Sequence, residues 1–178
     1  EINDRLRGVS RMEILEIILE KATKTYTDEE KEALATLKND YYKLLLSTKL
    51  TAKDILPGVK EILAGLKAKG IKIAIGSSSK NSPTILEQIG LAGYFDAEAD
   101  GNDIKESKPH PEVFLLAAEK IALKPENCLV VEDAEAGVTA ALAAGMKVLA
   151  VGAAITDERA NLAVADLSMT NVEQLLSL

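Results

Sequence analysis

Three short apolar runs separated by helical sequence constrain the fold of this chain more than any other feature. They occupy residues 71–76, 128–131 and 147–151 and are built mainly from isoleucine, valine, leucine and alanine. The sequence between and after them has the periodicity of helices, with proline or glycine near many of the helix ends. Alternating strands and helices predict a parallel sheet covered by helices on both faces. We therefore expect an α/β fold, a doubly wound parallel sheet with a Rossmann-like core.

The remaining elements of this core follow from local signals. Pro57-Gly58 and Gly70 mark the start and end of one helix, and Ser82-Pro83 is a good cap and first-turn pair for another. The expected helices cover 59–69, 82–90, 111–122, 134–144 and 171–177, with short strands near Ala97 and near Leu167.

The first fifty residues have a different pattern. Two amphipathic helices are expected there, one after an N-cap at Ser10 and one from Asp28 to about Ser47 after an N-cap at Thr27. We expect residues 1–50 to form a small helical cap domain and residues 51–178 to form the α/β core domain. The stretch 50–56 would connect them.

Composition excludes several classes of function. The net charge is −7 and no block of lysine and arginine is present, so no nucleic-acid partner is expected. No apolar segment approaches the roughly 20 residues that span a bilayer, and no signal-peptide pattern opens the chain. The single cysteine, Cys128, cannot form an intramolecular disulfide. These features predict a cytoplasmic protein, acting as a monomer, without a membrane partner.

Polar residues follow two of the apolar runs. Ser77-Ser78-Ser79-Lys80-Asn81 follows the first run, Glu132-Asp133 follows the second, and Lys108 stands before Pro109 between them. Strand ends meet at one edge of a parallel sheet, where ligands bind. Hydroxyls, a lysine and paired carboxylates would hold a phosphate together with a divalent metal such as Mg²⁺. The pattern favours phosphoryl chemistry.

Each of these residues also has a purely structural explanation. Asp133 would cap the next helix, the serines would form a polar turn, and His110 would cap the helix that opens at Pro111. Arg5, Arg7 and Arg11 gather around Gly8, where arginine could grip a phosphate, but on this pattern alone a charged helix entrance is the better explanation.

Taken together and in order, the motifs resemble the haloacid dehalogenase superfamily of phosphoryl-transfer enzymes. The matching parts are Ser77, Lys108 and Glu132-Asp133, and the helical module resembles the small cap of that superfamily's first subgroup. More narrowly, three segments resemble the β-phosphoglucomutase family: 5–11, Lys38-Asn39 and 77–83.

The resemblance implies an isomerase that interconverts β-glucose 1-phosphate and glucose 6-phosphate through an aspartyl-phosphate enzyme and a bisphosphate intermediate. It implies that Glu132 and Asp133 hold Mg²⁺, that Ser77 and Lys108 bind the transferring phosphoryl group, and that Arg11 grips the distal phosphate. The residues implied to contact sugar or phosphate are Arg7, Gly8, Lys38, Ser78, Ser79, Lys80 and Asn81. The implied partner is a small-molecule sugar phosphate.

One departure from the family pattern is large. The superfamily's first motif, a strand ending in Asp-x-Asp-Gly, supplies the nucleophile and the acid/base aspartate, and no Asp-x-Asp occurs in this chain. The resemblance leads us to expect roughly 35 to 40 residues before Glu1, far more than a frayed terminus. We expect their strand to lie mid-sheet, and this chain alone to be inactive. Two alternatives stay open: a sugar-phosphate phosphatase of the same superfamily, and an inactive module that binds a phosphate ligand.

Overall fold

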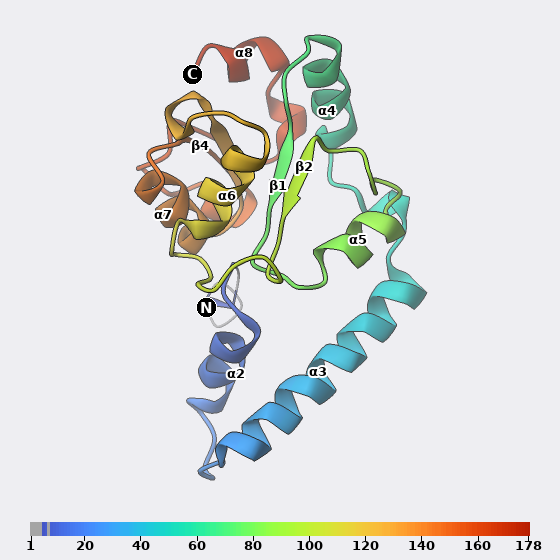
Figure 1. Ribbon diagram of the computed structural model, residues 1–178, viewed down its shortest axis with the longest axis vertical. Helices are drawn as coiled ribbons and strands as arrows, with labels where there is room; N and C mark the ends of the chain where they lie inside the picture. The colour runs from blue at the N-terminus through green and yellow to red at the C-terminus, as the bar shows by residue number, and fades with distance from the viewer. Residues whose placement is uncertain (1–4, 7) are drawn as a thin grey trace.

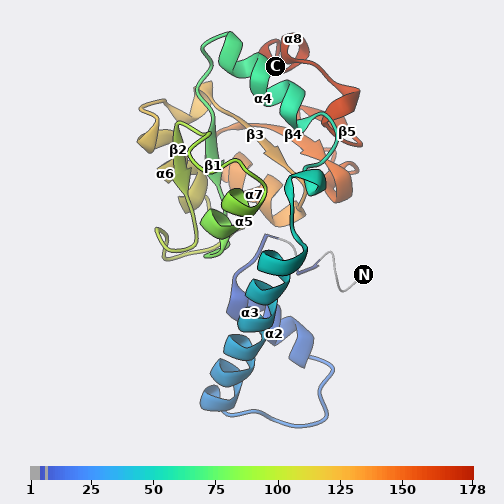
Figure 2. The same cartoon turned by 90° about the vertical axis from the view of Figure 1, so that its right-hand side faces the viewer.

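The computed structural model describes residues 5, 6 and 8–178 and has two lobes (Figure 1). The helical lobe consists of α2 (Arg11–Leu19) and α3 (Asp28–Lys49). The α/β lobe contains the remaining elements, beginning with the short 3-10 helix η1 (Ala52–Asp54). Figure 2, turned by 90°, again shows α2 and α3 projecting from one end of the α/β lobe. No helix in the described part of the chain is long and apolar enough to cross a membrane.

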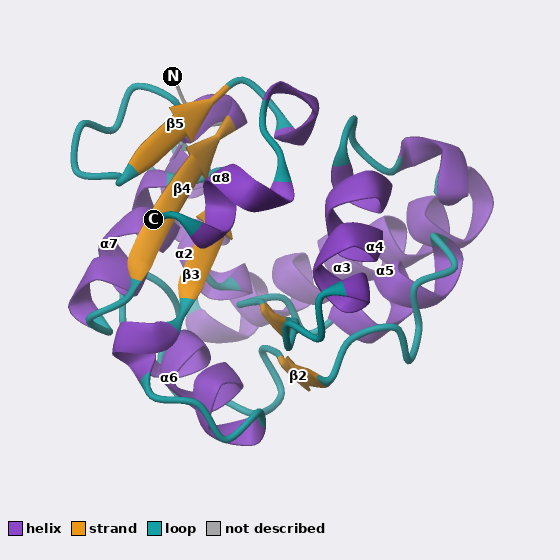
Figure 3. Cartoon of the chain, turned by 90° about the horizontal axis from the view of Figure 1, so that it is seen from above, coloured by secondary structure: helices purple, strands orange, loops and turns teal. Residues whose placement is uncertain are grey.

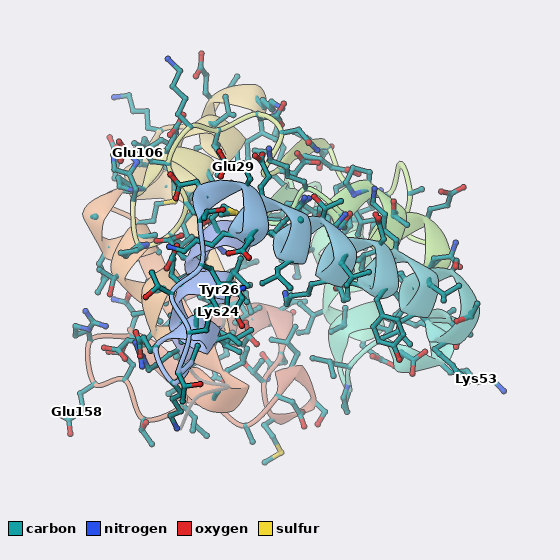
Figure 4. All side chains as sticks on the ribbon, turned by 90° about the horizontal axis from the view of Figure 1, so that it is seen from below. Lys24, Tyr26, Glu29, Lys53, Glu106 and Glu158 are labelled. Carbon is teal, nitrogen blue, oxygen red and sulfur yellow. The ribbon has the colours of Figure 1, made fainter. Side chains whose placement is uncertain are left out.

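Both helices of the helical lobe begin with a capping box, at the two N-caps that the sequence predicts. The Ser10 hydroxyl accepts from the Glu13 amide, and the Thr27 hydroxyl accepts from the Glu30 amide. The loop between them is stabilised in part by the Lys24 ammonium, which lies 4.9 Å from the centroid of the Tyr26 ring (Figure 4). These local contacts fix where each helix starts.

The α/β lobe alternates strands and helices along the chain. Its helices and strands are α4 (Val59–Ala68), β1 (Ala74–Gly76), α5 (Ser82–Gln88), β2 (Ala97–Ala99), α6 (Glu112–Lys120), β3 (Leu129–Glu132), α7 (Glu135–Ala143), β4 (Lys147–Val151), β5 (Leu162–Val164) and α8 (Val172–Leu176), with 3-10 helices η2 (Pro125–Asn127), η3 (Gly152–Ala154) and η4 (Leu167–Met169). All strand pairs are parallel. The expected α/β class with a parallel sheet is confirmed.

Helices cover both faces of β4, and this alternation forms the core. Val148 and Ala150 are fully buried in a cluster with residues of α6 and α7, whereas Leu149 between them packs with Ile62 of α4 and Val172 of α8. A parallel strand buried on both faces needs this continuous run of apolar residues.

The strands form two separate groups. β1 pairs with β2, and β3, β4 and β5 pair in that order. Figure 3 shows β3, β4 and β5 together, with β2 at a distance from them. Among the described residues, neither β1 nor β3 has a strand partner on its second edge. Val131 of β3 is 43% exposed, an unusual value for a residue in a parallel strand.

Some predicted boundaries were wrong for local reasons. The first strand begins at Ala74 and not at residue 71, because the Asp96 carboxylate accepts from the Ile73 amide in place of a strand partner. The strand expected near Leu167 lies at Leu162–Val164. Leu167 itself starts η4, because the Asp166 carboxylate caps that turn.

Two predicted helix caps were also wrong. Asn81, and not Ser82, is the N-cap of α5, and Ser82 is its first helical residue. Ala134, and not Asp133, is the N-cap of α7. The His110 ring does accept from the Glu112 amide at 3.3 Å, although Pro111 is the N-cap of α6.

Candidate functional site

The two predicted polar clusters follow β1 and β3, whose carboxyl ends carry the candidate site. The Ser77 amide donates to the Ala99 carbonyl at 2.9 Å, so Ser77 continues the pairing of β1 with β2 by one residue. Glu132 is the last residue of β3 and pairs in register with Ala150 of β4. The strand framework therefore fixes the backbone at both clusters.

A buried ion pair lies at the centre of the site. The Lys108 ammonium is 2.7 Å from the Glu132 carboxylate, and each side chain is only 7% exposed. The ammonium also lies 4.4 Å from the centroid of the Phe114 ring, within the range of a cation–π contact. The other Glu132 oxygen accepts from the backbone amides of Asp133 and Ala134, both at 3.1 Å. Both charges are thus compensated, as burial requires.

Gly137 makes room for the Glu132 carboxylate. A Cβ at position 137 would lie 2.0 Å from the Glu132 Cδ atom, a distance that no side chain can tolerate. This glycine lies in α7, where alanine would otherwise be preferred. The site therefore depends on a residue that the sequence analysis did not select, although a lone glycine early in an alanine-rich helix is a signal for such close approach.

Hydroxyl groups order the serine loop, residues 77–81. The Ser77 hydroxyl accepts from the Ser79 amide at 3.1 Å, and the Ser79 hydroxyl accepts from the Asn81 amide at 3.2 Å. The Ser78 hydroxyl accepts from the Lys108 amide at 3.2 Å and so joins this loop to the lysine. Because a hydroxyl both donates and accepts, each serine keeps a proton that it can donate to a phosphate oxygen.

Gly101 brings the chain after β2 against the serine loop. A Cβ at this position would lie 2.4 Å from the Ser78 carbonyl oxygen and 2.9 Å from the Lys80 amide nitrogen. Gly101 is buried, and its amide donates to the Ser79 carbonyl at 3.3 Å. The loop is therefore supported from beneath by backbone, and the sequence analysis did not identify Gly101.

Glu112 fixes the segment that leads to Lys108. Its carboxylate accepts from the Lys105 amide at 3.1 Å and from the Glu106 amide at 2.8 Å. These two backbone hydrogen bonds, the Glu106 one first, lower the pKa of Glu112. The sequence analysis did not select Glu112.

We expect this anchor to depend on pH. A lowered pKa means that Glu112 stabilises the folded loop above its ordinary value of 4.5 and that this stabilisation is lost as the pH falls through the lower, folded-state value. In an amide NMR titration the Glu106 signal should shift with a midpoint below 4.5, and in Glu112→Gln that transition should be absent. A midpoint at or above 4.5 would contradict the anchor.

Gly8, in the segment that leads into α2, lies beside the ion pair. This residue has a φ of +77°, and a Cβ there would lie 3.4 Å from the Ala134 Cβ and 3.8 Å from the Lys108 Cδ. Arg11, the first residue of α2, is half-buried. Of the predicted site residues, the structure brings Gly8, Ser78, Lys108 and Glu132 together.

Other predicted residues are less engaged. Lys38 and Lys80 are exposed, and neither forms an ion pair with another residue that the structure describes. Arg7 lies outside the described residues. Asn81 is buried, and its side chain donates a hydrogen bond to Asn39. Asn39 belongs to α3 and was given no separate role on the basis of the sequence.

The predicted metal ligands differ in their surroundings. Both oxygens of Glu132 already accept hydrogen bonds, whereas Asp133 is exposed at the strand end. The described residues contain no group of three or more His, Cys, Asp or Glu side chains placed to hold a metal. Asp133 fits Mg²⁺, which commonly takes one or two carboxylates together with waters and phosphate oxygens. The contacts of Glu132 favour a different role, as the partner of Lys108.

Comparison with known proteins places this site in a family. A family model described as haloacid dehalogenase-like hydrolase matches residues 4–145. The chain is 43% identical over 154 residues to a β-phosphoglucomutase of Bacillus subtilis (strain 168), which covers 85% of this chain and 68% of the relative. It is 30% identical over 183 residues to a phosphorylated carbohydrates phosphatase of Thermotoga maritima, which covers 99% of this chain and 81% of the relative.

A solved structure agrees with these matches. The crystal structure of a β-phosphoglucomutase from Clostridium difficile superposes with a TM-score of 0.91 at 39% identity, covering 99% of this chain and 79% of that one. At 39% identity the two proteins are similar in sequence as well as in fold. The chain therefore belongs to the haloacid dehalogenase-like hydrolase family.

Proposed function

We propose that this chain carries the phosphate site of a sugar phosphomutase, which interconverts β-glucose 1-phosphate and glucose 6-phosphate. The reaction would pass through an aspartyl-phosphate enzyme and a bisphosphate intermediate. One observation carries the proposal: Gly8, in the segment that leads into α2, lies beside the buried Lys108–Glu132 pair, so close that a Cβ at this position would be 3.8 Å from the Lys108 Cδ. The similarity to the Bacillus subtilis and Clostridium difficile β-phosphoglucomutases supports it.

The proposed roles follow from position and chemistry. The Lys108 ammonium and the Ser77 hydroxyl would bind the transferring phosphoryl group, because Ser77 follows the end of β1 and Lys108 reaches Glu132 at the end of β3, where the phosphate is expected. Arg11 would bind the distal phosphate from the helical lobe through its planar guanidinium group. The remaining contacts to sugar or phosphate would come from Arg7, Gly8, Lys38, Ser78, Ser79, Lys80 and Asn81.

The helical lobe would act as a cap. We assign residues 1–50 to a cap domain and residues 51–178 to the core domain, with Gly8 beside Lys108 on the cap side. A cap that covers the site excludes water, and this favours transfer of the phosphoryl group to a sugar hydroxyl over hydrolysis. The cap is therefore the part of the molecule that separates mutase from phosphatase activity.

Mg²⁺ is the proposed cofactor. Asp133 would hold the ion, and the ion would supply positive charge that stabilises the transferring phosphoryl group. Glu132 would join it only after releasing Lys108, since both of its oxygens are engaged. The Lys108 ammonium neutralises phosphate charge in either case.

The nucleophilic aspartate is proposed to lie on a further strand between β1 and β3. The unpaired second edges of these strands, among the residues described, and the 43% exposure of Val131 support this position. The sequence contains no Asp-x-Asp, so the strand would come from outside residues 1–178. Intact mass of the protein from its natural source tests this point: a mass above 19.0 kDa is expected, and 19.0 kDa itself would contradict it.

A sugar-phosphate phosphatase is the second candidate. The 30% identity to the phosphorylated carbohydrates phosphatase of Thermotoga maritima favours it. For either activity we propose a monomer in the cytoplasm that acts on a small phosphorylated sugar. It would have no nucleic-acid or membrane partner. The net charge of −7 and the lack of a basic block support that choice of partner.

Arg11→Ala distinguishes these two candidates. If Arg11 holds the distal phosphate, its loss should lower formation of glucose 6-phosphate at least tenfold, because a charge-assisted phosphate contact contributes about 1.5–3 kcal/mol. Hydrolysis of the phosphoryl enzyme should fall much less. The assay uses the protein that carries the proposed nucleophile and measures glucose 6-phosphate and inorganic phosphate together, with Arg5→Ala, whose guanidinium is exposed and paired with Glu20, as the control. Unchanged isomerisation in Arg11→Ala would argue against this role for the cap.

A further inference from the structure

A buried hydrogen bond joins the two lobes beside the serine loop. The Asn81 side-chain nitrogen donates to the Asn39 side-chain oxygen at 2.9 Å, and each residue is 8% exposed. Asn39 comes from α3 of the helical lobe and Asn81 from the start of α5. This bond lies on the same side of the α/β lobe as the segment with Gly8, where a Cβ would be 3.8 Å from the Lys108 Cδ.

Asn81 occupies a helix N-cap without using its side chain to cap the helix. An asparagine at this position usually accepts a hydrogen bond from an amide in the first helical turn, and Asn81 makes no such bond. Its backbone is held instead, because its amide donates to the Ser79 hydroxyl and its carbonyl accepts from the Ile85 amide. Since the backbone is fixed, the direction of the side-chain amide depends on its bond to Asn39.

Asn39 is a polar residue on an otherwise apolar helix face. The buried residues of α3 are Ala35, Asn39 and Leu46, so Asn39 lies on the face of the helix turned away from solvent. A buried amide without a hydrogen-bond partner is costly, and Asn81 provides that partner for Asn39. A hydrophobic residue would satisfy packing at this position, so packing alone does not account for asparagine there.

We propose that Asn39 is a positioning residue that orients the Asn81 amide toward the phosphate of a bound sugar phosphate. An amide nitrogen carries two hydrogens. Asn39 accepts one of them, and the other is available for a phosphate oxygen. Because Asn39 belongs to α3, this donor is in place only while α3 rests on α5. The inference rests on the proposed function and adds to it a link between the cap and the phosphate site.

A binding cycle tests the link, with glucose 6-phosphate as the probe and calorimetry as the measurement. Asn39→Ala should weaken binding about tenfold, the size expected when one hydrogen bond to a charged group is misaligned. In the Asn81→Ala background, Asn39→Ala should have little further effect, because no amide remains to be oriented. Thr36→Ala, an exposed substitution on the same helix, is the control and should bind as the unaltered protein does.

The outcomes separate this inference from the proposed function. If the unaltered protein binds glucose 6-phosphate and Asn39→Ala binds it equally well, the positioning role is wrong and the proposed function stands. The positioning role would also be wrong if Asn39→Ala weakened binding of glucose 6-phosphate equally in the unaltered and the Asn81→Ala backgrounds. A general loosening of the cap would explain such equal losses. If the unaltered protein does not bind the probe, both fail.

A measurement on the unaltered protein covers the case in which Asn39→Ala does not fold. The two side-chain amide protons of Asn81 give separate NMR signals. On addition of glucose 6-phosphate, one of them should shift by clearly more than the other, because the second stays bonded to Asn39. No shift in either signal would contradict the inference.

Discussion

Replacing Lys108 with methionine is expected to destabilise the protein by about 3 to 5 kcal/mol, the range measured when one partner of a buried ion pair is removed. The Glu132 carboxylate would stay buried, 7% exposed, without its counter-ion. Methionine keeps most of the apolar stem against Phe114, so the loss reports the charge and not the packing. Urea unfolding measures the effect.

Two further variants make this prediction specific. Lys108→Met combined with Glu132→Gln should recover most of the loss, because glutamine is uncharged and still accepts from the backbone amides of Asp133 and Ala134. Lys120→Met removes the exposed pair with Asp103 and the hydrogen bond to the Glu98 carbonyl, and it should destabilise the protein much less than Lys108→Met. The free energy of unfolding of Lys108→Met could instead lie within about 1 kcal/mol of that of the unaltered protein, roughly the value of a surface pair. In that case the buried pair does not stabilise the fold as expected.

Gly137→Ala is expected to destabilise the protein by about 1 to 3 kcal/mol, because the new Cβ would run into the Glu132 carboxylate 2.0 Å away. The sign is informative, since alanine inside a helix is normally more favourable than glycine by about 1 kcal/mol. Displacing the carboxylate should also weaken binding of inorganic phosphate by moving Lys108. Urea unfolding and a phosphate titration measure the two effects.

The control for Gly137→Ala is the same substitution where no carboxylate stands in the way. In the Lys108→Met and Glu132→Ala background, Gly137→Ala should become neutral or stabilising. A destabilisation of the same size in both backgrounds would show that the close contact with Glu132 is not the cause.

Local signals in the sequence were enough to predict most elements of the fold. The N-caps at Ser10 and Thr27, the glycine stop at Gly70 and the apolar run 147–151 each act over a few residues, and the structure has them where they were expected. The boundaries that failed were decided by contacts between distant residues. One such contact is the hydrogen bond that the Ile73 amide donates to the Asp96 carboxylate, 23 residues away in the sequence.

The candidate site divides in the same way. Ser77 and Glu132 could be selected because residue type and place at a strand end carry the information, and Lys108 because it is an isolated lysine before a proline. The ion pair between Lys108 and Glu132 could not be predicted, because it depends on how the loop before Pro109 folds back over β3. Asn39 and Gly101 were missed for a related reason, since each matters only through a neighbour brought close by the tertiary structure.

The proposed site transfers a phosphoryl group between positions of a sugar. The most direct test is a ³¹P NMR time course on the protein as its natural source makes it, supplied with β-glucose 1-phosphate, a catalytic amount of glucose 1,6-bisphosphate and Mg²⁺. We predict that glucose 6-phosphate accumulates while inorganic phosphate stays a minor product. Accumulation of inorganic phosphate without glucose 6-phosphate would contradict the mutase and leave the phosphatase as the function of this site.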